Sequence, residues 1–205
     1  MLFRSPFSRV KQERSSWEDE YSSGKWSCLG EAAEFAHYAI VAAFVQISQR
    51  PVRLLDIGCG EGQILKHLNL DLIAQYTGVD IAQAALDRIT PKRPQDRYVR
   101  STLENFRPDA KWDVILFNEV LYYTFDPVAN LKPFENALTP EGRMLISIYK
   151  KKNPFAWNNR CLRKVQRYSR DAGYSVEDSI EISKIDTRVT WQVSLVKPPR
   201  RLVQR

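Results

Sequence analysis

The chain has 205 residues, of which 43% are hydrophobic and 27% charged, a composition that predicts one globular domain and excludes a disordered chain. No apolar run approaches the ~20 residues of a membrane-spanning helix, and the first residues lack the apolar segment of a signal peptide. The three cysteines are far apart, without metal-ligand spacing, as in free thiols of a reducing compartment. We therefore expect a cytoplasmic protein with no metal site.

The net charge of +7 is compatible with an acidic partner, such as nucleic acid, a nucleotide-linked metabolite or an anionic membrane surface. A basic solvated surface with no partner is the alternative, because much of the excess lies near the termini and in one predicted helix.

Residues 1–50 are predicted to form an arm followed by a cap helix. The basic stretch Met1–Arg14 has no clear period, and Trp17, Tyr21 and Trp26 follow it among acidic residues. These aromatic side chains can form a lid over a ligand, or they can simply pack on the core.

Apolar residues at three- and four-residue steps predict a helix from Glu31 to Gln49. They are Ala32, Phe35, Ala36, Ala39, Ile40, Ala43, Phe44 and Ile47. His37 lies on this helix as a candidate substrate contact or proton acceptor, with a surface or partly packed histidine as the alternative.

The most informative stretch is an apolar strand, Val52–Ile57, that runs into glycines at positions 58, 60 and 62. A helix to about Leu70 is expected to follow. Glycine is needed where the backbone adopts positive φ or approaches a ligand closely, and a helix start offers unpaired N–H groups. The stretch therefore predicts a site for a polar ligand at a strand–helix turn.

The glycine spacing does not fit a dinucleotide site, which requires the third glycine three places after the second, and a phosphate-binding G-x-x-x-x-G-K-[ST] motif is absent. With Asp56 two places before the first glycine, the run Leu55–Gly62 resembles motif I of the class I S-adenosylmethionine methyltransferases. The resemblance implies S-adenosylmethionine as cofactor and S-adenosylhomocysteine as product. It also implies cofactor contacts from Asp56, Gly58, Cys59, Gly60, Gly62 and Gln63, and from the lid residues Tyr21 and Trp26.

A second short strand, Tyr76–Asp80, ends in a carboxylate about twenty residues after the glycine turn. Asp80, followed by Ile81, can accept both ribose hydroxyls of an adenosine, or it can cap a helix over Ile81–Ile89. After a third strand, Arg97–Arg100, the family often has an Asp near the adenine. This chain has Ser101 and Thr102 there, so a hydroxyl or the Leu103 backbone would contact the adenine.

The apolar run Val114–Phe117 suits a buried strand, and it ends in Asn118 and Glu119, where open α/β sheets bind ligands. It resembles the fourth strand of the methyltransferases, which places Asn118 and Glu119 near the cofactor and residues 119–123 near the substrate. The string Asn-Glu-Val-Leu-Tyr-Tyr is similar to small-molecule enzymes, including nodulation-type and sugar-modifying N- or O-methyltransferases. Glu119, Tyr122, Tyr123 and His37 are the candidate catalytic bases.

The C-terminal part predicts a strand at Arg143–Tyr149, a helix at Phe155–Ala172, and strands at Tyr174–Ser183 and Thr190–Lys197 that form an antiparallel hairpin. One helix face carries Arg160, Arg163, Lys164 and Arg167. Such a face can bind phosphates or can simply be solvated.

We expect a three-layer αβα Rossmann-like fold whose seven-stranded sheet is mostly parallel, with a methyltransferase core at 51–197 and a basic tail at 198–205. The expected function is methyl transfer to a nitrogen or oxygen atom of a small molecule. This molecule can be a sugar or a nucleotide-linked sugar, and it can be anionic. The alternatives are an RNA-directed methyltransferase or RNA-binding protein that uses the basic 150–170 face, and a non-catalytic cofactor-binding module. Either a monomer or a homodimer is compatible with the sequence.

Overall fold

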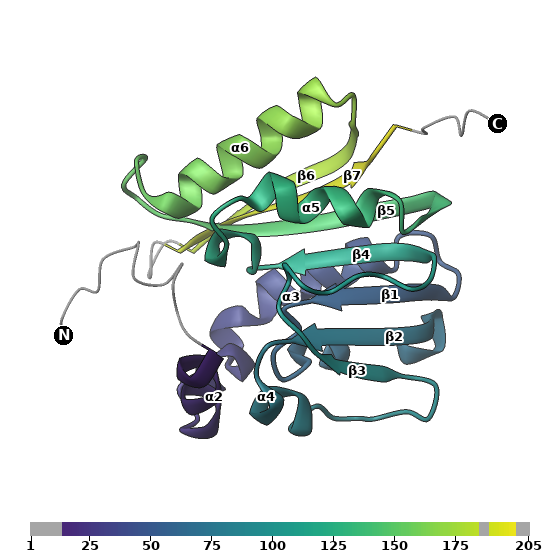
Figure 1. Cartoon of the computed structure of the whole chain (residues 1–205), viewed down its shortest axis with the longest axis vertical. Coiled ribbons are helices and arrows are strands. Elements are labelled where there is room, and N and C mark those ends of the chain that lie inside the picture. Colours follow the sequence, from purple (N-terminus) through teal and green to yellow (C-terminus); the bar gives the residue numbers. More distant parts are fainter. Residues whose placement is uncertain (1–13, 185–188, 200–205) are drawn as a thin grey trace.

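The computed structural model describes residues 14–184 and 189–199, so most of the predicted arm and tail lies outside the described residues. A 7-stranded sheet has the order β3-β2-β1-β4-β5-β7-β6 (Figure 1). The strands are β1 (Val52–Ile57), β2 (Ile73–Asp80), β3 (Arg97–Arg100), β4 (Trp112–Asn118), β5 (Leu138–Lys150), β6 (Ser175–Ser183) and β7 (Thr190–Lys197). Strands β1 to β5 pair in parallel, whereas β7 is antiparallel to both β5 and β6, which confirms the predicted fold class.

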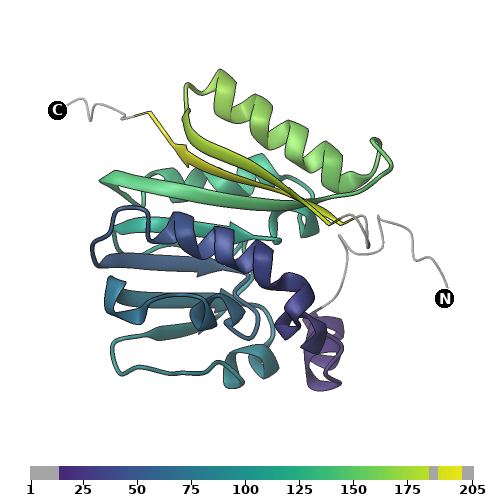
Figure 2. The same cartoon turned by 180° about the vertical axis from the view of Figure 1, so that it is seen from behind.

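Helices cover both faces of this sheet. The α-helices are α2 (Arg14–Ser22), α3 (Ala32–Val45), α4 (Gln83–Asp87), α5 (Pro127–Glu135) and α6 (Trp157–Asp171). Short 3₁₀ turns are η1 (Ser27–Gly30), η2 (Gln63–Lys66), η3 (Leu70–Leu72) and η4 (Leu121–Tyr123). Helix α3 lies on one face and helices α5 and α6 on the other (Figures 1 and 2). None of the described helices combines the length and apolarity needed to cross a membrane.

The two-residue period of the strands divides the core into two halves. On β1, Leu54 packs in the cluster under α3, whereas Leu55 packs in the cluster under α5 and α6. On β4, Leu116 and Phe117 alternate in the same way. Because both faces are buried, each central strand is a continuous apolar run, which is why the sequence predicted these strands so clearly.

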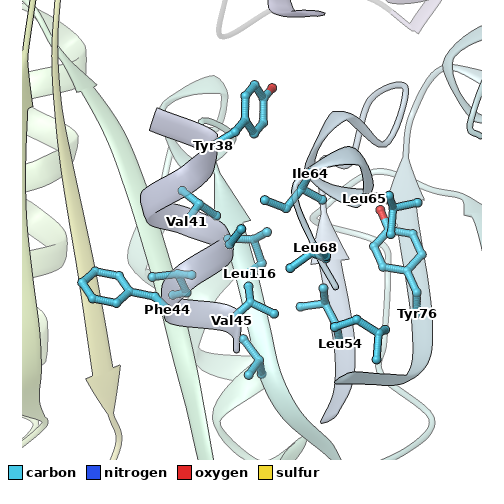
Figure 3. Packing of buried hydrophobic residues seen from close by; sticks show 14 of the residues in the cluster. Tyr38, Val41, Phe44, Val45, Leu54, Ile64, Leu65, Leu68, Tyr76 and Leu116 are labelled. Atoms are coloured by element: carbon cyan, nitrogen blue, oxygen red, sulfur yellow. The ribbon is translucent and has the colours of Figure 1, made fainter. Parts of the chain in front are cut away.

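Helix α3 buries a different face from the one that its apolar spacing indicated. Tyr38, Val41 and Val45 point into the core (Figure 3), whereas Phe35 is 51% exposed and Ile47, beyond the end of the helix at Val45, is 47% exposed. The helix is apolar on nearly all sides, so periodicity alone could not select the buried stripe. The same rotation buries His37, which is 1% exposed and therefore not a surface histidine.

The helix predicted after β1 is also wrong, because the segment forms only the 3₁₀ turns η2 and η3. Gly62 adopts a left-handed φ of 66° before η2, and the Asn69 side chain accepts a hydrogen bond from the Asp71 N–H at 3.1 Å. Local side-chain bonds of this kind compete with helix formation. The glycine turn is therefore not followed by a long helix whose dipole could attract a ligand.

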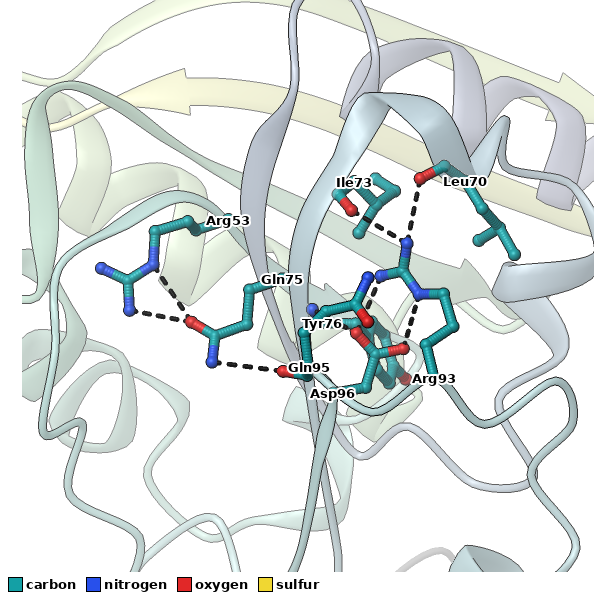
Figure 4. Close-up of polar contacts among 8 residues, drawn as sticks. All are labelled: Arg53, Leu70, Ile73, Gln75, Tyr76, Arg93, Gln95 and Asp96. Carbon is teal, nitrogen blue, oxygen red and sulfur yellow. Dashed lines mark hydrogen bonds and ion pairs between the residues drawn. The ribbon is translucent and has the colours of Figure 1, made fainter.

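Partly buried polar contacts fix the strand ends that lie away from the glycine turn. The Arg93 guanidinium donates to the carbonyls of Leu70 and Ile73, both at 2.9 Å, and to the Asp96 carboxylate (Figure 4). Asp96 also accepts the Tyr76 N–H at 3.0 Å. The loop before β3 is thereby attached to the start of β2, which aligns the ligand-binding ends of both strands.

Candidate active site

The carboxyl ends of the parallel strands meet along one edge of the sheet, and a cavity of about 520 Å³ opens there. Every predicted site residue except Gly62 lines it. They are Tyr21, Trp26, His37, Asp56, Gly58, Cys59, Gly60, Gln63, Asp80, Ile81, Thr102, Leu103, Asn118, Glu119, Tyr122 and Tyr123. The volume is typical of small-molecule sites, and the sheet order spreads the lining from β3 at one end to β7 at the other.

The glycine turn after β1 forms the floor of the cavity. Gly58 and Gly60 have φ values of 74° and 53°, in the left-handed region that favours glycine. A Cβ at Gly58 would lie 2.5 Å from the Val120 side chain, and one at Gly60 would lie 2.7 Å from the Tyr21 hydroxyl. Gly62 shapes the turn from outside the cavity, where a Cβ would meet Ile89.

Two oxygen acceptors at the floor have no hydrogen-bond partner in the described part of the chain: Asp56 Oδ1 and Asn118 Oδ1. The second oxygen of Asp56 accepts the Tyr76 hydroxyl at 2.9 Å. Burial raises the pKa of Asp56 to about 7, and the Tyr76 bond only partly offsets this effect. Because a buried polar atom without a partner is costly, the floor is suited to a ligand that brings hydrogen-bond donors.

The carboxylate of Asp80 holds the glycine turn in place. Its oxygens accept the N–H groups of Gly60 at 2.8 Å and Ala82 at 2.9 Å. Burial raises the pKa of Asp80, although both backbone bonds counteract the rise. The alternative that Asp80 is the N-cap residue of the next helix is wrong, because α4 is shorter than predicted and its N-cap is Ala82.

The N-terminal helix α2 supplies the side chain that caps α4, and the sequence did not reveal this contact. The Glu18 carboxylate accepts the N–H groups of Gln83 and Ala84, both at 2.8 Å. Arg88 donates in turn to the carbonyl groups of Tyr21 and Ser22. These contacts hold α2 against the β2–α4 connection, with its aromatic side chains on the cavity wall.

The aromatic residues on this wall form a connected group. Trp17 stacks on Trp26 with ring centroids 5.8 Å apart and meets Tyr123 edge to face at 4.9 Å. Trp26 and Tyr21 lie 6.2 Å apart. Helix α2 thus occupies the position of a lid that excludes water from the glycine turn.

We expect Glu18→Gln to loosen this lid, because an amide is a weaker acceptor for two N–H groups than a carboxylate. The loss of a cap costs about 1 kcal/mol, so S-adenosylhomocysteine affinity should fall several-fold and proteolysis near Lys25 should accelerate. Limited proteolysis and calorimetry measure both effects. Asp19→Asn on the same helix is the matched control, since Asp19 is exposed; equal behaviour of the two variants would contradict the anchoring role.

A chain of hydrogen bonds connects Glu119, after β4, to His37 on α3. Glu119 Oε1 accepts the Ser147 hydroxyl at 2.7 Å, and Ser147 Oγ lies 2.8 Å from His37 Nε2. Glu119 Oε2 accepts the Tyr122 hydroxyl and the Tyr149 N–H, both at 2.9 Å. Burial raises the pKa of Glu119, while the nearby His37 side chain and these hydrogen bonds lower it.

Both carboxylate oxygens of Glu119 therefore already accept hydrogen bonds from the protein. This indicates that Glu119 positions neighbouring groups rather than acting as an available base. Ser147, fully buried on β5, was missed by sequence reasoning. The one signal was a hydroxyl inside an apolar strand. The catalytic roles predicted for Glu119, Tyr122, Tyr123 and His37 stay predictions.

A glycine turn after β1, an acid at the end of β2 and a polar pair at the end of β4, on a sheet with an antiparallel β7, define the class I methyltransferase architecture. The chain matches the family described as "Methyltransferase domain" over residues 31–191, most of its length. It therefore belongs to this S-adenosylmethionine-dependent family, and the predicted family and cofactor are confirmed.

Curated relatives include methyltransferases of different substrates. The chain is 33% identical over 102 residues to a ubiquinone biosynthesis O-methyltransferase of Bradyrhizobium diazoefficiens, covering 47% of this chain and 39% of that protein. It is 25% identical over 148 residues to histamine N-methyltransferase of Cavia porcellus, covering 61% and 50%. The chain thus spans half or less of these relatives.

Solved structures share the fold over nearly the whole chain. The N-methyltransferase NodS of Bradyrhizobium japonicum, in complex with S-adenosylhomocysteine, has a TM-score of 0.72 and 16% identity, covering 96% of this chain and 100% of that one. The 1,6-didemethyltoxoflavin-N1-methyltransferase of Burkholderia thailandensis has a TM-score of 0.70 and 20% identity, covering 98% and 93%. At these identities the likeness concerns the fold.

Proposed function

We propose that the protein transfers a methyl group from S-adenosylmethionine to a nitrogen or oxygen atom of a small molecule. The observation that carries the proposal is the row of acceptors along the cavity floor, Asp56, Asp80 and Asn118, beside bare glycine backbone. These residues fit a ligand with an ammonium group at one end and a ribose at the other. When bound, the cofactor supplies an electrophilic methyl group on a sulfonium centre.

The residues of the chain then contribute position and exclusion of water, which are the main protein contributions to such a transfer. Gly58 and Gly60 allow close backbone contact, Asp80 is the candidate for the ribose, and Asn118 is the candidate for the methionine part. The lid aromatics cover the turn. Thr102 already accepts the Asn105 N–H at 3.2 Å, so the Leu103 backbone is the better candidate for the adenine.

Calorimetry with S-adenosylmethionine and S-adenosylhomocysteine tests the proposal. We expect binding of both, and Asp80→Ala should weaken it by at least about tenfold, because the ribose loses its acceptor and the Gly60 N–H loses its partner. Asp71→Asn, at an exposed carboxylate, is the matched control. Unchanged affinity of Asp80→Ala would refute the ribose assignment. Binding without transfer to any of a broad metabolite panel would favour the non-catalytic module.

An RNA-directed function is the second candidate, favoured by the exposed basic face of α6. This face consists of Arg160, Arg163, Lys164, Arg167 and Arg170. If it binds RNA, affinity should fall steeply with salt and should be lost when Arg160, Arg163 and Arg167 are replaced by alanine. Failure to bind RNA at moderate salt would eliminate this candidate.

A further inference from the structure

The cavity has the opposite charge character from the molecule as a whole. The chain carries a net charge of +7, yet no Lys or Arg is present among the described residues that line the cavity. The lining carboxylates are Glu34, Asp56, Glu61, Asp80, Glu104 and Glu119. A low-dielectric cleft lined by one sign of charge concentrates ligands of the other sign, so this cavity selects against anions.

Some of these carboxylates already interact with other groups of the protein or lie beside the glycine turn. Glu61 pairs with Arg88 at 3.1 Å, and Asp80 holds backbone N–H groups. Glu34, on the first turn of α3, is different. Its carboxylate lies 3.8 Å from Nδ1 of His37, beyond hydrogen-bond distance, and its side chain keeps 21% exposure. Glu34 therefore offers acceptor oxygens on the part of the cavity wall that α3 forms.

His37 beside it carries an acceptor of its own. Since the single hydroxyl hydrogen of Ser147 goes to Glu119, the short contact between Ser147 Oγ and His37 Nε2 requires Nε2 to be the donor. In the neutral imidazole, Nδ1 is then unprotonated. Nδ1 is buried and has no hydrogen-bond donor among residues 14–184 and 189–199, although His37 lines the cavity and is 1% exposed.

Aromatic rings complete this part of the cavity. Trp191 of β7 stacks on the His37 ring with centroids 4.9 Å apart, and Tyr149 of β5 lies 6.5 Å from Trp191. Tyr38 of α3 lines the same wall. Outside the lining, Lys184 already lies over the Trp191 ring at 5.6 Å. Because His37 and Lys184 already cover the Trp191 ring, Tyr38 and Tyr149 are the rings left to face an organic ammonium group beside the Glu34 carboxylate.

We propose that this part of the cavity, defined by Glu34, His37, Tyr38, Tyr149 and Trp191, binds the ammonium group of an amine, and that this amine is the methyl acceptor. The proposal rests on the proposed methyl transfer and names the substrate class of that site. It differs from the anionic and nucleotide-linked acceptors that the sequence left open. A phosphate or carboxylate here would face Glu34 and Glu119, and Lys184, which lies over the Trp191 ring, is not among the residues that line the cavity.

An ammonium group must lose a proton before its nitrogen can act as a nucleophile. In the assigned site one N–H bond of the ammonium breaks, its electron pair stays on nitrogen, and the proton forms a new bond to Nδ1 of His37. Glu34 stabilises the resulting imidazolium directly. Ser147 and Glu119 are positioning residues, because they fix the tautomer in which Nδ1 can accept.

Three probes that differ in one group test the ammonium site: benzylamine, benzyl alcohol and benzoate. Each is titrated into the protein saturated with S-adenosylhomocysteine and into the protein alone, so that the result does not depend on cofactor binding. We expect benzylamine to bind about tenfold more tightly than benzyl alcohol, and benzoate not to bind. Glu34→Gln should remove the benzylamine preference and leave the affinity for benzyl alcohol and S-adenosylhomocysteine unchanged. Glu31→Gln, an exposed acid just before α3, is the matched control.

Nitrogen-15 NMR of the imidazole rings reports the tautomer independently, and the chain has only two histidines to assign. We expect the His37 signal of an unprotonated Nδ1, which shifts toward imidazolium when benzylamine binds. Equal or tighter binding of benzoate, absence of binding by all three probes at millimolar concentration, or a protonated Nδ1 with Nε2 bare would each overturn the proposal. Failure of S-adenosylhomocysteine to bind would instead count against the proposed function.

Discussion

Replacement of Gly58 by alanine is expected to destabilise the protein by about 2–5 kcal/mol and to weaken S-adenosylhomocysteine binding by about 100-fold. A left-handed φ of 74° disfavours any residue with a Cβ, and here that Cβ would lie 2.5 Å from Val120 Cγ2. Neither the backbone strain nor the contact with Val120 can be relieved without moving the glycine turn that lines the cavity. Chemical denaturation and calorimetry measure the two effects.

Gly24→Ala separates the two causes, because Gly24 has nearly the same φ, 73°, with no atom within 4 Å of the added Cβ. It should cost only the backbone term of about 1–2 kcal/mol and leave cofactor affinity unchanged. Adding Val120→Ala to Gly58→Ala should recover part of the loss. If Gly58→Ala and Gly24→Ala behave alike, contact with Val120 does not matter.

The part of the cavity around the glycine turn was predictable because its chemistry lies in short local patterns. The glycines after β1, Asp80 after β2 and Asn118 after β4 each follow a buried strand. Parallel strands then bring these ends to one edge without further information. Spacing alone therefore placed residues from three separate segments around one cavity.

The part of the cavity around His37 was not predictable, because its contacts join residues that no local pattern connects. His37 and Ser147 are 110 positions apart and meet only because α3 packs across β5. The spacing of α3 pointed to the wrong face, since small and large apolar residues surround it. The capping of α4 by Glu18 also depends on tertiary packing. A carboxylate 65 positions away carries no signal near Gln83.

The stability of the ligand-free protein should fall as pH rises from about 4 to 7, and Asp56→Asn should remove much of this fall. Burial raises the pKa of Asp56 from 3.8 to about 7, so between these values the folded protein holds a proton that the unfolded chain has released. The stabilisation is complete below the unfolded pKa and is lost as pH passes through the folded value. Its upper limit is about 4 kcal/mol.

Chemical denaturation across this pH range checks the expectation, with the exposed Asp71→Asn as control. Parallel profiles for wild type and Asp56→Asn would contradict it. The amide keeps an acceptor for Tyr76 but cannot ionise, so the two effects of Asp56 can be separated. If Asp56 faces the positive part of the cofactor, S-adenosylhomocysteine affinity should rise with pH in the wild type and stay flat in Asp56→Asn. The ionised Asp56 carboxylate would then destabilise the ligand-free protein near neutral pH and stabilise the complex with the cofactor.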